Sequence, residues 1–164
     1  MGTVKVRKAT RGDLIEIGRV ADAAHWGAYS GLLAPWTITR LLQRDFSPGP
    51  LKRRLMSGQV VVAESADSLV GFADAEVQPG SVRLTALSTD PECRRRGIGT
   101  ALLAAVREMA PDLPVSADVL LGSLEVERFF ESRGFVPGET LNGMLFDEPV
   151  VERRWWLPAG DAQH

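Results

Sequence analysis

The chain has 164 residues, of which 45% are hydrophobic and 24% are charged. This size and apolar content suit a globular domain that buries its own core, and they argue against intrinsic disorder. Lys and Arg (19) nearly balance Asp and Glu (21). A general nucleic-acid or anionic-membrane surface is therefore disfavoured, although a local basic cluster is compatible with this balance.

Cysteine and histidine, the usual ligands of zinc, are scarce. Cys93 is the only cysteine, which excludes an intramolecular disulfide and a Cys-rich zinc site, and His25 and His164 are the only histidines. The first ten residues lack the apolar core of a signal peptide, and the longest apolar run, 101–106, is too short to span a bilayer. We therefore expect no metal, no membrane association and a cytoplasmic location.

The first part of the chain predicts one short strand followed by helices. Val4 and Val6 alternate with charged residues, as in a strand. Thr10 and Asp13 have the spacing of a capping box. The Ser-Pro-Gly-Pro sequence at 47–50 is typical of a loop. Helices are expected at 10–29, 35–42 and 51–57, the last closed by Gly58.

The remainder predicts a sheet interrupted by two helices. Strand patterns at 60–63, 69–77 and 82–88, joined by turns, form an antiparallel meander. Helices are then expected at 97–109 and 123–133, and strands at 115–121, from Phe135, and at 150–157, with a turn at Asn142-Gly143. This order predicts an α/β (α+β) fold with helices on both faces of a mixed, mostly antiparallel sheet. We expect one domain, 1–158, and a disordered tail, 159–164.

A loop after the meander carries the sharpest chemical signal. It opens the fourth helix, and its two glycines, two residues apart, let the backbone approach a bulky anion. The helix N-terminus and the arginines suit phosphate oxygens. Neither a P-loop nor a dinucleotide fingerprint is complete here, and a solvated basic loop is the simpler alternative. The residues are Arg94, Arg95, Arg96, Gly97, Ile98, Gly99 and Thr100.

Together with the amphipathic segment 124–135, this loop resembles the GNAT superfamily of acyl-CoA-dependent N-acetyltransferases. Arg94, Gly97 and Gly99 match the family's Arg/Gln-x-x-Gly-x-Gly/Ala motif, and nearly the whole chain follows its element order. The resemblance implies about seven strands, with a bulged fourth strand that diverges from the strand beginning at Val115. Coenzyme A, as acetyl-CoA, would contact the 94–100 loop and the residues Leu87, Ser88, Thr89, Ser123 and Phe130.

The segment 25–36 resembles the substrate-side helices of family members. Its aromatic side chains either wall an acceptor pocket or pack the helices onto the sheet: Trp26, Tyr29 and Trp36. Arg83, near the expected slot, is a further candidate contact to the acceptor. Of the adjacent Trp155 and Trp156, one should face the core and the other either a partner surface or the acceptor cleft, and we favour a homodimer contact.

Three residues depart from the family pattern. Phe130 replaces a tyrosine proposed to protonate the leaving thiolate, Arg83 replaces a glutamate base, and Ser123 replaces an asparagine that contacts the coenzyme. An alkylammonium, with a pKa near ~10, must lose a proton before it attacks. The candidate bases are Glu76, Asp74 and His25, although each also has an ordinary structural role, and a water chain is an alternative.

These residues favour an N-acetyltransferase that moves an acetyl group to a primary amine of a small molecule, peptide or protein. The alternative is a non-catalytic acyl-CoA sensor, which Phe130 and Arg83 favour. A third reading is an unrelated nucleotide-binding domain with the same Arg-Gly loop. The expected partners are an amine acceptor and a second copy of the chain, and neither nucleic acid nor a membrane is expected.

Overall fold

The computed structural model describes residues 3–57, 59–93 and 97–160. These residues form a seven-stranded sheet with the order β1-β2-β3-β4-β5-β7-β6, in which only β4 and β5 are parallel neighbours. The predicted mixed, mostly antiparallel sheet is confirmed. Its strands are β1 Lys5–Lys8, β2 Val60–Ser65, β3 Ser68–Gln78, β4 Ser81–Thr89, β5 Val115–Leu120, β6 Val136–Leu145 and β7 Glu148–Leu157.

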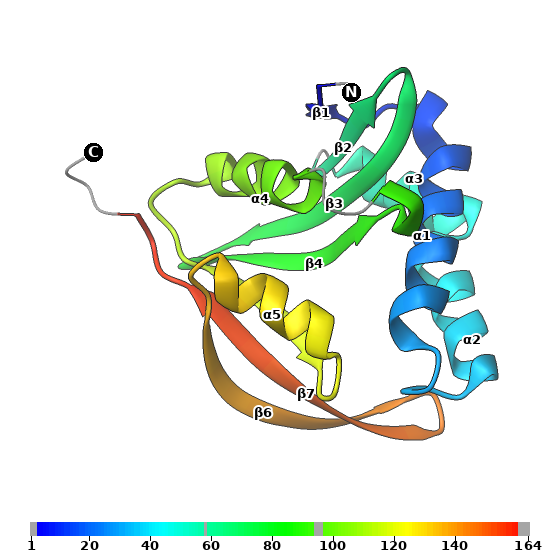
Figure 1. The fold of residues 1–164 in the computed structure, drawn as a ribbon, viewed down its shortest axis with the longest axis vertical. Coiled ribbons are helices and arrows are strands. Elements are labelled where there is room, and N and C mark those ends of the chain that lie inside the picture. The colour runs from blue at the N-terminus through cyan, green and yellow to red at the C-terminus, as the bar shows by residue number, and fades with distance from the viewer. Residues whose placement is uncertain (1–2, 58, 94–96, 161–164) are drawn as a thin grey trace.

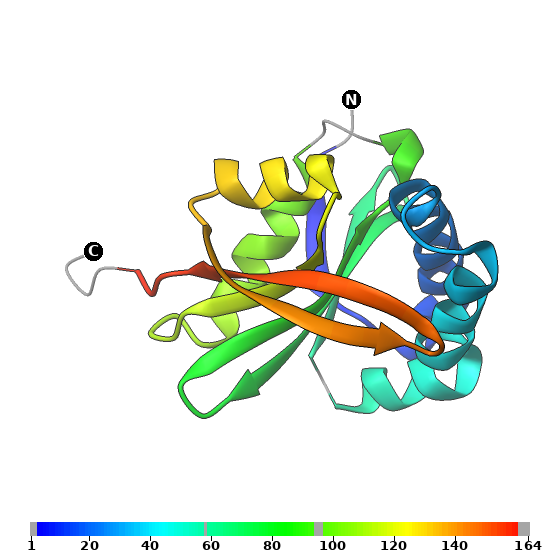
Figure 2. The same cartoon turned by 90° about the horizontal axis from the view of Figure 1, so that it is seen from below.

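Helices cover both faces of the sheet, as Figures 1 and 2 show. One face packs on α1, α2 and α3 around Ile17, Leu51 and Phe72, and the other packs on α4 and α5 around Leu102 and Phe130. The helices of the described residues are α1 Leu14–Tyr29, α2 Pro35–Phe46, α3 Pro48–Met56, α4 Ile98–Met109 and α5 Leu124–Ser132, with 3₁₀ turns at Arg11–Asp13 and Pro91–Cys93.

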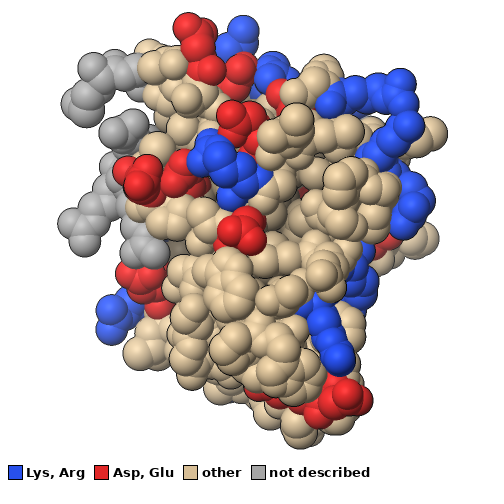
Figure 3. Space-filling model, turned by 90° about the vertical axis from the view of Figure 1, so that its right-hand side faces the viewer, with Lys and Arg blue, Asp and Glu red and all other residues tan. Residues whose placement is uncertain are grey.

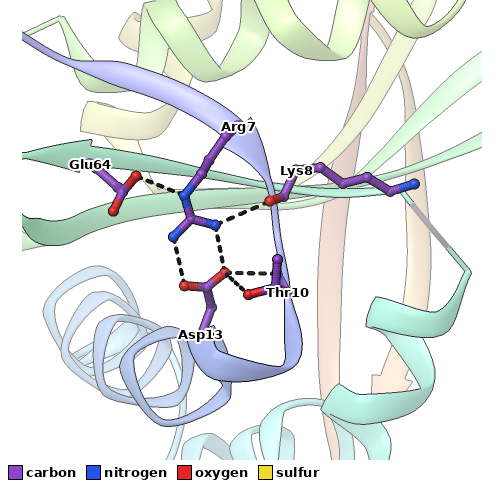
Figure 4. A network of polar contacts seen from close by, with 5 residues as sticks. All are labelled: Arg7, Lys8, Thr10, Asp13 and Glu64. Atoms are coloured by element: carbon purple, nitrogen blue, oxygen red, sulfur yellow. Dashed lines mark hydrogen bonds and ion pairs between the residues drawn. The ribbon is translucent and has the colours of Figure 1, made fainter.

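A polar network fixes the start of α1 against β1. The predicted capping box is present: the backbone N–H of Thr10 donates to Asp13 at 2.8 Å. The guanidinium of Arg7 donates to both carboxylate oxygens of Asp13 at 2.8 Å and to Glu64 at 2.7 Å (Figure 4). These donors hold the pKa of Asp13 below its ordinary value, the Arg7 hydrogen bond being the largest cause. The network joins β1, β2 and α1.

A predicted loop and a predicted turn are both wrong. The segment 47–50 is not a loop, because α3 begins at Pro48, where the missing proline N–H has no helical partner to lose. Asn142-Gly143 is not a turn but part of β6, and the chain reverses at Phe146 and Asp147, with Phe146 at a φ of 59°. The pairing of Gly143 with Val150 continues the ladder through the expected turn. Gly58 lies outside the described residues.

The β6–β7 hairpin is tied to α2. The backbone N–H of Ala34, which precedes α2, donates to the Glu148 carboxylate at 3.0 Å. Arg40 lies over the rings of Trp36 and Phe146, 5.0 and 5.8 Å from their centroids. The hairpin therefore closes one end of the fold.

The tryptophan pair behaves as predicted only in part. Trp155 is 3% exposed and lies in the core, as expected for one member of the pair. Trp156 is half-buried, and its ring would lie 3.2 Å from a Cβ added at Gly138. The glycine in β6 therefore leaves room for this ring.

The substitution Asp13→Ala tests the α1 network. It removes the cap and leaves Arg7 with one carboxylate partner, so the free energy of unfolding should fall by about 1–3 kcal/mol. Chemical denaturation measures the change, with the exposed Asp112→Ala as the matched control. Equal stability of the two variants would contradict the structural role of Asp13.

Candidate functional site

The site begins where two parallel strands separate. β4 and β5 pair at only three positions, from Val82–Val115 to Leu84–Ala117. Next to the last pair, β4 carries a bulge: Ala75 faces Leu84 and Asp74 faces Ala86, which leaves Thr85 as the extra residue. A bulge increases local twist and bends a strand. The rest of β4 therefore diverges from β5, as the resemblance implied.

A cleft of about 960 Å³ lies at this divergence. It is bordered by the C-terminal half of α1, the end of β4, the start of α4 and one side of α5. Its lining includes many of the residues predicted to contact the coenzyme: Leu87, Ser88, Thr89, Gly97, Ile98, Gly99, Ser123 and Phe130. Residues separated by more than 40 positions in the sequence thus share one concave surface.

The start of α4 has the geometry of an anion site. Gly97 is its N-cap, with a φ of 72°, a conformation that favours glycine. The first N–H groups of a helix lack intrahelical partners, and the helix dipole favours negative charge there. Arg94, Arg95 and Arg96 lie outside the described residues, so their predicted role stays a prediction.

α4 and α5 approach each other closely at Gly99. A Cβ added there would lie 2.7 Å from the Phe129 ring, so the absence of a side chain permits this contact. Arg133 stacks 3.9 Å from the centroid of the same ring and donates to the Thr100 hydroxyl at 2.8 and 3.0 Å. Thr100 itself does not line the cleft. The sequence analysis assigned Gly99 to the approach of an anion and did not predict its contact with Phe129 or the role of Arg133.

The turn before this helix is anchored to α1. Arg19 donates to Asp90 at 3.1 Å and to the Leu69 carbonyl at 3.1 Å. Asp90 is 8% exposed and also accepts the Glu92 N–H at 3.0 Å. These bonds fix the end of β4 and the turn after it.

Two residues at α5 match the expected donor pocket. The Ser123 hydroxyl is buried and has no hydrogen-bond partner among the described residues, while the residue lines the cleft. A buried polar group without a partner costs free energy, which a bound ligand would recover. Phe130 is 4% exposed between Phe129 and Phe135, with ring centroids 5.3 and 4.7 Å away. The residues present therefore fit coenzyme A.

The three candidate bases lie in different environments. Glu76 is exposed on β3, opposite Arg83. Asp74 is buried and paired with Arg54 of α3, and burial raises its pKa against the opposing effect of that arginine. Only His25 lines the cleft. The structure thus does not bring the three together.

The His25 ring lies in a largely buried environment, which is unusual for a base. Burial lowers its pKa, and this effect exceeds the opposing backbone contact to Ala21. Its Nδ1 lies 2.8 Å from the Ala21 carbonyl, so a neutral ring donates there and leaves Nε2 with a free lone pair. The ring also packs edge-on against Phe46 and Tyr29.

The residues predicted to contact the acceptor also lie in different parts of the structure. Tyr29 lines the cleft. Trp26 packs in the small core between α2 and the β6–β7 hairpin, and Trp36 is 47% exposed beside Arg40. Arg83 lies 3.6 Å from Asp118, which is also held by Arg154 at 2.8 and 3.0 Å.

Glu152 is a candidate that sequence reasoning missed. It faces Leu120 across the β5–β7 ladder and is half-buried. Among the described residues its carboxylate makes no hydrogen bond or ion pair. Burial, followed by the charge of Asp118, raises the pKa of this carboxylate. The charge of Glu152 itself raises the pKa of Tyr29, after the larger effect of burial. Only the antiparallel pairing of β5 and β7 places this glutamate near α1, so no local pattern predicts it.

The described residues hold no group of three or more His, Cys, Asp or Glu side chains able to bind a metal. No helix among them is long and apolar enough to cross a membrane. Figure 3 views the face formed by α1, α2 and α3: acidic and basic side chains mix over its upper part, and uncharged surface predominates over its lower part.

Comparison with known proteins gives the family. The model of the acetyltransferase (GNAT) domain matches residues 56–137, and the chain belongs to this family. No curated protein sequence matches the chain.

Solved structures share the fold at low identity. The PaiA N-acetyltransferase from Thermoplasma acidophilum, in complex with coenzyme A, has a TM-score of 0.80 at 18% identity, covering 92% of this chain and 98% of that one. A GCN5-related N-acetyltransferase from Rhodopseudomonas palustris also has a TM-score of 0.80 at 18% identity, with 96% and 97% covered. The ribosomal-protein-S18-alanine N-acetyltransferase from Escherichia coli has a TM-score of 0.69 at 17% identity, with 99% and 97% covered.

The coupling of Glu152 to Tyr29 is directly testable, because Tyr29 is the only tyrosine. The Glu152→Gln substitution removes a negative charge that disfavours the phenolate, so the pKa of Tyr29 should fall while burial keeps it above the ordinary value of ~10. Ultraviolet absorbance of the phenolate measures the shift. Glu131→Gln, at an exposed position of α5, is the matched control, and equal titration curves for both variants would contradict the coupling.

Proposed function

We propose that this protein transfers an acetyl group from acetyl-CoA to a primary amine of a small molecule, peptide or protein. The observation that carries the proposal is the cleft at the β4–β5 divergence, which joins the Gly97–Gly99 start of α4 to the open edge of β4 in a GNAT-family chain. We further propose that it works in the cytoplasm, without a metal, and that a homodimer is one form of it.

The donor would bind along three elements. The pyrophosphate would meet the N-terminus of α4 at Gly97 and Gly99, where free N–H groups favour an anion. The pantetheine arm would pair with β4 from Leu87 to Thr89, whose β5 side lacks a partner strand. Ser123 would donate or accept the hydrogen bond that its buried hydroxyl lacks. A neighbouring fold with coenzyme A, from Thermoplasma acidophilum, supports this choice of donor.

Groups of this chain would assist a direct attack of the amine on the thioester. Holding the amine and the thioester together supplies much of the rate, because the encounter becomes effectively unimolecular. A backbone N–H near Leu87 would stabilise the negative charge that develops on the carbonyl oxygen. No covalent attachment to the protein is needed, because a thioester is already activated.

Of the predicted bases, His25 has the best-supported position. Asp74 is committed to Arg54, and Glu76 does not line the cleft, whereas His25 lines it with Nε2 free. Its lowered pKa keeps the ring neutral at neutral pH, so that Nε2 is able to accept a proton. Asp45 and Asp22 oppose this lowering and Arg54 adds to it, all by charge.

The alternative is an acyl-CoA sensor without turnover. Phe130, which has no proton to donate, and Arg83, which is not a base, favour it. Both functions require coenzyme binding, and only the enzyme releases thiol when amines are added.

Thermal unfolding with acetyl-CoA tests donor binding. At a ligand concentration about a hundred times the dissociation constant, stability should rise by ~3 kcal/mol, and adenosine should give much less. Gly99→Ala should lose this effect because its Cβ would meet the Phe129 ring at 2.7 Å, while Gly143→Ala, with no atom within 4 Å, should keep it. A melting curve that acetyl-CoA leaves unchanged would refute the donor.

Thiol release with a panel of primary amines tests turnover and the base. His25→Gln should lower kcat by ~10²-fold or more and remove the acidic limb of the pH–rate profile. In the wild type this limb should lie below about 6.5, since the pKa of His25 is lowered and only the neutral ring accepts a proton. Glu76→Gln is the control: if it removes the limb and His25→Gln does not, Glu76 is the base.

A further inference from the structure

Arg133 places a positive charge on the cleft that no carboxylate of the described residues neutralises. It follows the last residue of α5, is half-buried, and lines the cleft. Its guanidinium donates to the Thr100 hydroxyl at 2.8 and 3.0 Å, to the Ser132 hydroxyl at 2.7 Å and to the Phe129 carbonyl at 3.3 Å. All of these acceptors are uncharged, so the side chain is held in place and keeps its net charge.

Most other hydrogen-bonded arginines of the described residues are paired with a carboxylate. The pairs are Arg7–Asp13, Arg19–Asp90, Arg44–Asp45, Arg54–Asp74 and Arg154–Asp118. Arg153 donates to the Gly138 carbonyl instead, and it does not line the cleft. Arg133 therefore differs from the other hydrogen-bonded arginines, because it is fixed by neutral groups and also borders the cleft.

The contacts of Arg133 orient its guanidinium before a ligand binds. The group lies 3.9 Å from the centroid of the Phe129 ring, and two of its nitrogens donate to Thr100. An arginine loses side-chain entropy when it binds an anion, and a side chain that is already held loses less. The Arg133 side chain is therefore preorganised for a ligand.

The groups around Arg133 also favour an anion. Thr100 lies in the first turn of α4, whose free N–H groups and dipole attract negative charge. The carbonyl oxygens that end α5 stabilise the guanidinium, whereas the N-terminus of α4 opposes it. Arg128 lines the same cleft, is exposed, and makes no hydrogen bond or ion pair with the described residues. Among the described lining residues the only carboxylate is Glu125, at the start of α5. The cleft is therefore positive where α4 begins and α5 ends.

A phosphate monoester is the anion that fits these donors. It carries a charge of about −1.5 to −2 at neutral pH, and the planar fork of an arginine matches its oxygens. In the proposed function, the N–H groups at Gly97 and Gly99 bind the pyrophosphate of coenzyme A. Coenzyme A has one further phosphate, a monoester at the 3′ position of the ribose that also bears the pyrophosphate. The α5 arginines lie beside the pyrophosphate position and are available for this group.

We propose that Arg133 binds the 3′-phosphate of coenzyme A, with Arg128 as a second cation beside it, and that the protein therefore prefers coenzyme A to its 3′-dephospho form. The inference rests on the donor of the proposed function. In this arrangement α4 binds the pyrophosphate through its backbone, and α5 binds the 3′-phosphate through side chains. Arg133 determines donor specificity and takes no part in the chemistry of the acyl group.

Isothermal titration calorimetry with coenzyme A and 3′-dephospho-coenzyme A tests this role. Wild type should bind coenzyme A about 10-fold more tightly, because the dephospho form cannot make the charge-assisted bond. In Arg133→Gln the two ligands should bind with nearly equal affinity. Arg107→Gln, at an exposed position near the other end of α4, is the matched control and should keep the preference. A preference that survives in Arg133→Gln would overturn the proposal.

The ratio of the two dissociation constants separates ligand binding from a structural role. If Arg133 only joined α5 to α4, Arg133→Gln would weaken both ligands equally and leave the ratio unchanged, which would overturn the proposal. The same result would be obtained if the guanidinium bound the pyrophosphate. Arg133→Lys keeps the charge but loses the fork and the flat stack on Phe129, so it should retain part of the preference.

Binding and turnover separate this inference from the proposed function. A wild type that prefers coenzyme A through Arg133 but releases no thiol with any amine supports the inference and lacks the proposed activity. A wild type that turns over but binds the two ligands equally keeps the proposed function and refutes the role of Arg133. If neither ligand binds, both are refuted.

Discussion

The separation of β4 from β5 is the constraint on which the site depends. Pairing ends after Leu84 and Ala117, next to the bulge at Thr85. Parallel strands that stayed paired would use their backbone N–H and C=O groups in hydrogen bonds to each other. The divergence instead leaves these groups of β4 available along one edge. The cleft, the open edge from Leu87 to Thr89, and the approach of α4 and α5 to the same space all follow from it.

Helix α1 connects this opening to the rest of the molecule. Its start is fixed by Arg7 and Asp13, its middle holds the turn after β4 through Arg19 and Asp90, and its end carries His25 and Tyr29 into the cleft. A single helix thus anchors the sheet, the turn that leads to the predicted coenzyme loop, and the proposed base His25. Because these anchors are on one rigid element, their relative positions change little.

The departures from the family pattern have structural counterparts. Arg83, at the position of the family glutamate, points its charge toward Asp118, which Arg154 also holds. Phe130 belongs to an aromatic cluster in the core, where a hydroxyl would need a partner. Elsewhere on the cleft, the Ser123 hydroxyl is buried without a partner among the described residues.

Local sequence patterns determined most of the helices and strands of this protein. Periodicity and capping residues placed α1, the meander and α4, and the Gly97–Gly99 spacing predicted an anion site at the start of α4, because these signals depend only on neighbours along the chain. They failed at 47–50 and at Asn142-Gly143, where proline fits a first helical turn and glycine continues a ladder. Only the tertiary structure separated His25 from Asp74 and Glu76, and only it brought Glu152 near Tyr29. Those relations join residues far apart in sequence, so they depend on strand order and packing, which no local pattern encodes.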